Sequence, residues 1–317
     1  MRSVAKKILW MCLMLFVLLM PIYGREDMVH LMTITGIWII IAMGLNVLTG
    51  YMGYVSFGHA AFTGLGAYGS AILSLRLGMD FWPSMAIAAS ATAVLGALLG
   101  FGILRLTGAY FSIGTLLLGE ILYSVYYNWS GVTGGYMGLT SLPTPELFLP
   151  GQGIIPFTLI HWFYFVHLVV FLMVVGIREM VSSQFGKELI AIRENESFAE
   201  SVGVNVKRRK IQCFALSAFL AGLGGAFFAH FLESIGPDSF TVGRSLEFIT
   251  IIIIGGLGSL VGPILGSYIL ILLSLYLEVL GAWRMVVYGM IIIVVLFFGR
   301  GGIVGMMERI FKLDLRK

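Results

Sequence analysis

Ionisable side chains inside long apolar segments are the residues of this 317-residue sequence with the clearest potential for chemistry. Glu120 occurs in LLLGEILY and His59 in SFGHAAF, each among apolar neighbours. A charge within a membrane span is costly, so such a residue marks a transport pathway or a polar contact between helices. The two side chains are also of the types that act as general acid and base, although a membrane-integral enzyme needs more polar groups converging at one depth.

Further residues in or beside apolar segments are candidates for lining a path across the membrane. Asn46 suits a bond to a neighbouring backbone, and Thr133, Gly134 and Gly135 suit a turn at an outer helix end with exposed backbone N–H groups. Each also has a purely structural interpretation, as packing or as a satisfied hydrogen bond. With the two ionisable residues, the candidate pathway set is Asn46, Tyr54, Phe57, His59, Glu120, Thr133, Gly134 and Gly135.

No other pattern indicates a catalytic residue, a cofactor or a metal site. The two cysteines, Cys12 and Cys213, are not spaced like metal ligands, and two cysteines are too few for a disulfide framework. The sequence also lacks the Gly-x-x-x-x-Gly-Lys-Ser/Thr loop that cradles nucleotide phosphates. Any ATP chemistry linked to this chain must therefore come from another polypeptide.

A charged island interrupts a chain that is 59% hydrophobic and only 11% charged. Residues 186–210, GKELIAIRENESFAESVGVNVKRRK, hold ten of the 36 formally charged residues. At 100° per residue, residues 188–203 form one amphipathic helix that Gly203 ends. Its apolar arc holds Ala191, Ile192, Phe198, Ala199 and Val202, and its polar face holds Arg193, Glu194, Glu196 and Glu200.

The charge of this polar face indicates what the island contacts. A helix that lies on lipid carries basic residues on its polar face, and this face is mostly acidic. An amphipathic helix seated in a groove of a soluble partner fits better, with a solvated loop as the alternative.

The elements that position these residues are membrane helices, since an ordinary soluble domain is about 25% charged. Each span needs about 20 apolar residues. The apolar segments are residues 6–23 (a span, or alternatively a signal peptide), 31–49, 54–75, 82–104, 109–128, 161–178, 211–232, 246–277 and 284–299.

Basic residues set the orientation of these spans. Arg2, Lys6 and Lys7 place the N-terminus in the cytoplasm, and the basic C-terminal tail belongs there too, which requires an even number of spans. The segment 246–277 is long and contains the helix-breaking run GGLGSLVGP, so we divide it into spans 246–256 and 262–278. The sequence thus predicts an all-α polytopic membrane bundle of about ten helices, nine if the Gly-rich segment is not broken.

Residues 1–317 are predicted to form a single membrane domain with two main loops. Residues 179–210 form a cytoplasmic loop, and residues 129–160, rich in Pro and Gly, form an irregular external loop. Membrane lipid is an expected partner and nucleic acid is not, because basic residues in such a protein mark cytoplasmic loops.

Several stretches together resemble the branched-chain amino acid permease family of ABC importers, the LivH/LivM type, and the LivM branch more closely. They are 44–68 (GLNVLTGYMGYVSFGHAAFTGLGAY), 112–139, with a Gly-Glu followed by TGGYMGL, 210–229 and 251–270. The stretch ESFAESVG, residues 196–203, resembles the family's coupling motif more loosely, since Ser197 and Phe198 stand where small residues are usual.

This resemblance implies a permease in the inner membrane of a prokaryote, driven by two ATPase subunits that hold ATP and magnesium. The charged island would be the helix that docks on the ATPase, through Ala191, Ile192, Arg193, Glu196, Phe198, Ala199, Glu200, Val202 and Gly203. A second, homologous permease subunit and an extracytoplasmic substrate-binding protein would complete the transporter.

The substrate and the energy source stay open at this level. The family suggests leucine, isoleucine and valine, whereas related permeases take urea or short amides. An ion-gradient-driven secondary transporter of small polar solutes is the alternative mechanism, but it favours inverted repeats and several buried carboxylates.

Overall fold

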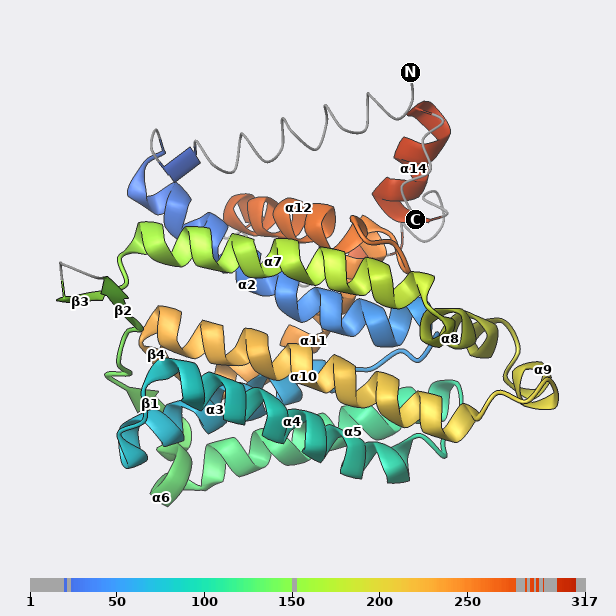
Figure 1. Ribbon diagram of the computed structural model, residues 1–317, viewed down its shortest axis with the longest axis horizontal. Helices are drawn as coiled ribbons and strands as arrows, with labels where there is room; N and C mark the ends of the chain where they lie inside the picture. Colours follow the sequence, from blue (N-terminus) through green and yellow to red (C-terminus); the bar gives the residue numbers. More distant parts are fainter. Residues whose placement is uncertain are drawn as a thin grey trace.

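The computed structural model is a bundle of roughly parallel and antiparallel helices (Figure 1). It describes residues 24–149, 153–277 and 301–311, residues 20–21 and a few single positions between 283 and 293. The predicted first span, 6–23, and last span, 284–299, lie essentially outside the described residues.

Two long helices form the centre of the bundle. They are α2 (Glu26–Asn46), which continues into the π-helical turn η1 (Val47–Tyr51), and α10 (Val206–Leu232). Their most apolar windows are 78% and 61% buried inside the protein. Both helices are surrounded by other helices, so apolar residues occupy all their faces and form one continuous core.

Three further long helices lie at the periphery. They are α4 (Phe81–Ile103), α5 (Ala109–Asn128) and α7 (Leu159–Ser182). Only 28% of the most apolar window of each is buried in the protein. Their outer apolar faces therefore suit lipid or another membrane protein. Together with α2 and α10 they are the described helices that are long and apolar enough to cross a membrane, so the predicted total of ten spans is not established.

Small residues bring helix α3 (His59–Leu77) into close contact with α10. A Cβ atom on Gly66 would lie 2.0 Å from the Gly222 carbonyl oxygen, and one on Gly225 would lie 1.9 Å from the Thr63 carbonyl oxygen. Backbone contact of this kind is the usual role of glycine in membrane helices, and it allows α3 to pack directly against α10.

The prediction of a helical span at residues 54–75 is wrong in its first part. After η1 the chain runs without helix from Met52 to Gly58, and α3 begins only at His59. The π-helical turn places an extra residue in the last turn of α2, a device that often marks a functional site. The irregular segment 52–58 is partly buried, with Tyr54 and Ser56 buried and Gly53 and Val55 exposed, and other groups bond its backbone.

The predicted break in segment 246–277 is present. Helix α11 (Val242–Gly255) and helix α12 (Gly262–Leu277) are joined by a loop in which Gly256 and Gly258 have positive φ angles of 126° and 68°. Helix α14 (Gly302–Phe311) follows next among the helices of known bounds and contacts α11 and α12. Both helices beside the loop are shorter than a full span.

Short elements occupy the two ends of the bundle. At one end lie α8 (Gln184–Glu194) and α9 (Glu196–Ser201), which connect α7 to α10 (Figure 1). At the other end lie α6 (Ser130–Thr133), η2 (Gly135–Met137), η3 (Pro237–Phe240) and the antiparallel strand pairs β1 (Leu139–Thr140) with β4 (Ser234–Ile235) and β2 (Glu146–Leu149) with β3 (Gly153–Pro156). The predicted irregular loop 129–160 thus contains ordered short elements.

Candidate functional site

The charged island forms two helices, so the prediction of one helix over 188–203 is wrong. Asn195 has extended backbone angles and its side chain accepts a hydrogen bond from the Phe198 N–H at 3.0 Å, which caps α9. Short polar side chains favour such caps over helix interiors. Gly203 has a φ angle of 91°, and Asn205 caps α10 in the same way as Asn195 caps α9. The predicted end of the island helix near Gly203 agrees with the structure.

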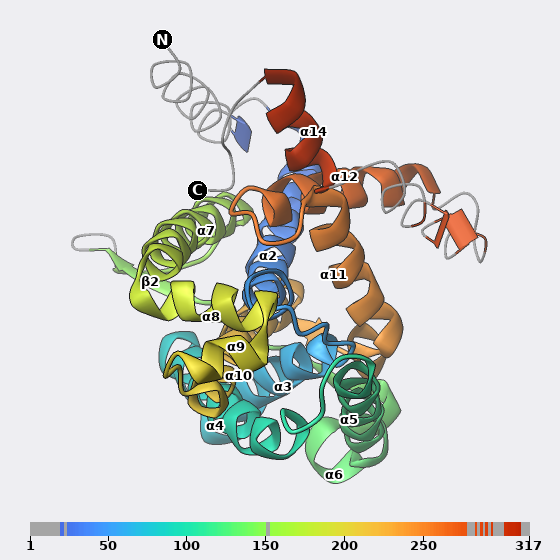
Figure 2. The same ribbon diagram turned by 90° about the vertical axis from the view of Figure 1, so that its right-hand side faces the viewer.

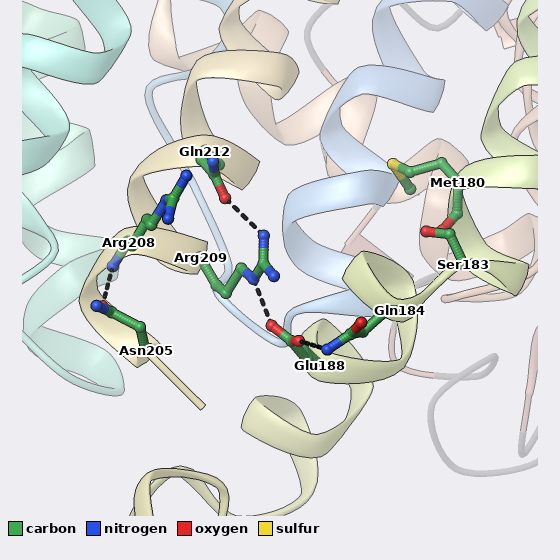
Figure 3. A network of polar contacts seen from close by, with 8 residues as sticks. All are labelled: Met180, Ser183, Gln184, Glu188, Asn205, Arg208, Arg209 and Gln212. Atoms are coloured by element: carbon green, nitrogen blue, oxygen red, sulfur yellow. Dashed lines mark hydrogen bonds and ion pairs between the residues drawn. The ribbon is translucent and has the colours of Figure 1, made fainter. Parts of the chain in front are cut away.

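The loop that contains α8 and α9 is attached to the bundle in three places. The first attachment joins α8 to α10 (Figure 3). The Arg209 guanidinium donates to Glu188, which also accepts from the Gln184 amide at 2.9 Å, and Arg209 donates to Gln212 at 3.0 Å. The hydrogen bond from Arg209 lowers the pKa of the Glu188 carboxyl. This ion pair therefore contributes stability at neutral pH that is lost only as the pH falls through the lowered pKa.

The second attachment is a partly buried polar triad between α9, α10 and the irregular segment 52–58. The Lys210 ammonium pairs with Glu196, and the Tyr54 hydroxyl donates to the other Glu196 oxygen at 2.7 Å. The Lys210 Nζ atom also lies 4.7 Å from the centre of the Tyr54 ring. The Lys210 side chain is only 5% exposed. Lys210 was not among the predicted site residues. Its partner Glu196 lies 14 positions earlier, across a turn, and helical periodicity does not reveal a contact of that kind.

The third attachment links α8 to the end of α2 and to the glycine loop after α11. The Arg193 guanidinium donates to the Gly50 carbonyl oxygen at 2.8 Å. Nearby, the Asn46 amide donates to the Ser259 carbonyl and accepts from the Gly258 N–H, both at 2.9 Å. Asn46 therefore holds the α11–α12 loop against α2, and its side-chain amide is occupied on both sides.

The predicted apolar arc of the island divides into a buried part and an exposed part. Ile192 and Ala199 are buried against the bundle, whereas Phe198 and Val202 are 65% and 61% exposed. Glu194 and Glu200 are exposed beside them. Figure 2, which looks at this end of the bundle, places α9 on its outer surface. Phe198 on α9 and Val202, directly after its last residue, form an exposed apolar ridge with acidic neighbours, which we call the α9 ridge.

The irregular segment 52–58 connects this end of the molecule to α5. The Ser112 hydroxyl donates to the Val55 carbonyl at 2.8 Å, and the Phe57 N–H donates to the Thr115 hydroxyl at 3.1 Å. A Cβ atom on Gly58 would lie 2.3 Å from the Thr115 carbonyl oxygen. Segment 52–58 is therefore fixed to Glu196 through Tyr54 and to α5 through its backbone.

Glu120 lies near the middle of α5 on the face that points away from the bundle. Its exposed neighbours include Leu117, Ile121 and Val125, with which it lines an open surface hollow. Within the described part of the chain it has no hydrogen-bond or ion-pair partner. A carboxylate at this depth requires water or a second protein, because lipid tails solvate no charge.

The structure gives the remaining predicted pathway residues structural contacts. His59 is buried, and its Nε2 atom donates to the Ile41 carbonyl at 3.0 Å. The Thr133 hydroxyl donates to the Tyr126 carbonyl at 2.7 Å, beside Gly134 and Gly135, which both have positive φ. The eight residues do not form one cluster: Tyr54 contacts the charged island and Thr133 lies at the opposite end of the bundle. Among the described residues no group of His, Cys, Asp and Glu side chains is arranged to hold a metal ion.

Comparison with known proteins places this chain among membrane transporters. The family described as branched-chain amino acid transport system / permease component matches residues 28–296. The chain is 30% identical to the high-affinity branched-chain amino acid transport system permease protein LivM of Escherichia coli (strain K12), over 98% of this chain and 78% of that protein. No solved structure gives a significant match.

Of two further relatives, one carries the same substrate name as LivM and the other a different one. The high-affinity branched-chain amino acid transport system permease protein BraD of Pseudomonas aeruginosa is 25% identical, over 89% of this chain and 96% of that protein. The autoinducer 2 import system permease protein LsrC of Salmonella typhimurium is 28% identical, over 68% of this chain and 62% of that protein. The chain belongs to the branched-chain amino acid transport system / permease component family and is a membrane permease subunit of a transport system.

Proposed function

We propose that this chain is one of two permease subunits of an ABC importer in a prokaryotic inner membrane, driven by ATPases on separate chains. The end that carries α8 and α9 and both termini lie in the cytoplasm, and an extracytoplasmic binding protein delivers substrate to the other end. ATP and magnesium belong to the partner ATPases. Basic residues favour this orientation, because Arg105 and Lys207 to Lys210 belong to the α8–α9 end.

The α9 ridge is the observation that supports this proposal most. Exposed apolar side chains on a short helix suit a groove on a partner protein. The loop behind the ridge is attached to α10, to the end of α2 and, through Tyr54, to segment 52–58. A partner that pulls on the ridge therefore moves these elements together, and segment 52–58 passes the movement to α5.

We assign two roles to the exposed face of α5. It lines the path of the substrate across the membrane, and it contacts the second permease subunit. Glu120 needs a wet or protein-covered surface, and its apolar neighbours suit the aliphatic side chains of leucine, isoleucine and valine. The names of LivM and BraD support branched-chain substrates, whereas the name of LsrC leaves related small solutes as a second candidate. Urea or short amides belong to that second class.

Purification of the tagged chain in mild detergent tests the assembly. We expect an ABC ATPase and a second, related permease to co-purify with the wild type. Gly203→Pro is expected to lose the ATPase, because proline requires a φ angle near −65° and Gly203 has 91°. Gly78→Pro is a matched control, because Gly78 also has positive φ and ends a helix at the opposite end of the bundle.

One result would contradict this assembly, and a second would contradict a specific role of Gly203 in it. Absence of any ATPase from the wild-type preparation would favour an ion-gradient-driven transporter. Equal loss of ATPase from both proline variants would mean general misfolding rather than a specific defect at the coupling loop.

Substitution of Glu120 tests the proposed path. Glu120→Leu is expected to reduce leucine uptake about tenfold or more, because it removes the hydrated carboxylate from the substrate path and leaves that surface apolar. The ATPase is expected to co-purify as with the wild type. Ser124→Leu, on the same face, controls for added bulk. Uptake of labelled leucine, valine and urea by both variants measures the effect. Unchanged uptake in Glu120→Leu would show that Glu120 does not line the substrate path.

A further inference from the structure

The exposed face of α4 carries an apolar stripe that ends at two basic residues. The stripe consists of Ile87, Val94, Leu98 and Phe101, each more than two-fifths exposed. These positions recur at helical spacing and run for about 21 Å along the helix. Arg105 lies two residues after the end of α4, and Lys207, in the first turn of α10, lies beside it on the same Phe101 ring.

The side chains of Arg105 and Lys207 both lie over the ring of Phe101. The Lys207 Nζ atom lies 4.4 Å from the centre of the Phe101 ring, and the Arg105 Cζ atom lies 5.2 Å from it. Both side chains are exposed, and neither has a carboxylate partner among the described residues. Two like charges held this close favour an anion between or beside them.

If α4 crosses a bilayer, its length places these cations in the headgroup region. Trp82, at the opposite end of α4, is an aromatic residue of the kind that sits at a membrane surface. Trp82 and Ile103 are separated by about 32 Å along the helix, close to the roughly 30 Å of a hydrocarbon core. Arg105 lies two residues further, where a long basic side chain reaches lipid phosphates.

We propose that Arg105, Lys207 and the Phe101 ring form a binding site for the headgroup of an anionic phospholipid. The phosphate lies against the two cations and the acyl chains follow the stripe on α4. The continuity of the stripe with the cations favours a lipid over an acidic soluble surface, because an anionic phospholipid joins a charged headgroup to apolar chains in that order. The proposal is independent of the substrate and of the ATPase.

Native mass spectrometry of the full chain tests this site. The protein is released from mixed micelles containing phosphatidylglycerol or phosphatidylcholine, and retained lipid is counted. We expect preferential retention of phosphatidylglycerol, weakened about fivefold by Arg105→Gln or by Lys207→Gln and more by both together. Arg105→Lys is expected to retain binding. Lys187→Gln, which removes an exposed cation from α8, is the matched control.

Four outcomes would overturn the proposal. The first is equal retention of the two lipids, and the second is an equal loss in Lys187→Gln. The third is displacement of phosphatidylglycerol by millimolar glycerol 1-phosphate, which indicates a site for a soluble phosphate rather than a lipid. If the double variant retains lipid normally but loses co-purifying ATPase, the cations contact the partner protein instead. Thermal unfolding of each variant separates these outcomes from misfolding.

Discussion

Replacing Glu196 by alanine is expected to lower the free energy of unfolding by about 3 kcal/mol, because it leaves the buried Lys210 ammonium without its counter-charge. This is the lower end of the usual range, since the Glu196 side chain is 37% exposed and water relieves part of the cost. The Tyr54 hydroxyl loses its acceptor as well. Unfolding of the purified protein in detergent at pH 7 measures the effect.

Two further variants identify the cause of this loss. Glu200→Ala removes an exposed glutamate from the same short helix and is expected to change stability by less than about 0.5 kcal/mol. Combining Glu196→Gln with Lys210→Met removes both charges and is expected to recover most of the lost stability. Equal effects of Glu196→Ala and Glu200→Ala would mean that the buried pair does not hold the loop.

Replacing Phe198 by aspartate is expected to weaken capture of the ATPase at least about thirtyfold, as for a large apolar residue at the centre of a protein interface. The fold is expected to be unaffected, because Phe198 is 65% exposed and contributes little to the core. Uptake should fall in parallel with capture. Titration of the purified permease with the ATPase measures the affinity directly.

The conservative variant Phe198→Leu keeps an apolar side chain on the ridge. We expect it to retain most of the affinity, since the interaction depends on apolar burial rather than on an aromatic ring. A Phe198→Asp protein with normal ATPase capture and normal uptake would show that the α9 ridge is not the docking surface. A loss of thermal stability in that variant would instead point to a structural role for Phe198.

The long spans are the part of the fold that the sequence predicts best. Runs of apolar residues with little charge specify α4, α5, α7 and α10 within a few residues, because a bilayer requires both length and internally satisfied backbone. The glycine run 255–263 likewise predicts the break between α11 and α12. The family resemblance is confirmed by the match over residues 28–296.

The breaks inside apolar segments are where sequence-based prediction fails. Residues 52–58 are mostly apolar, yet they are not helical. Ser112 and Thr115 supply hydrogen bonds to their backbone, and Glu196 accepts one from the Tyr54 side chain, all from distant parts of the chain. The island forms two helices because the Asn195 side chain can cap α9. A helical wheel shows which residues share a face and does not show such a cap. Periodicity reports which residues share a face only where the helix is continuous.

The sequence by itself determined the class of protein, the positions of α4, α5, α7 and α10 and the position of its charged loop, since these depend on local composition. Only the tertiary structure decided which polar residues meet. It pairs Glu196 with Lys210 and Tyr54, encloses His59 and Asn46, and leaves Glu120 and Phe198 exposed. The physical reason is that burial and pairing depend on contacts between helices far apart in the chain, where side-chain direction and backbone breaks decide which groups lie within hydrogen-bonding distance.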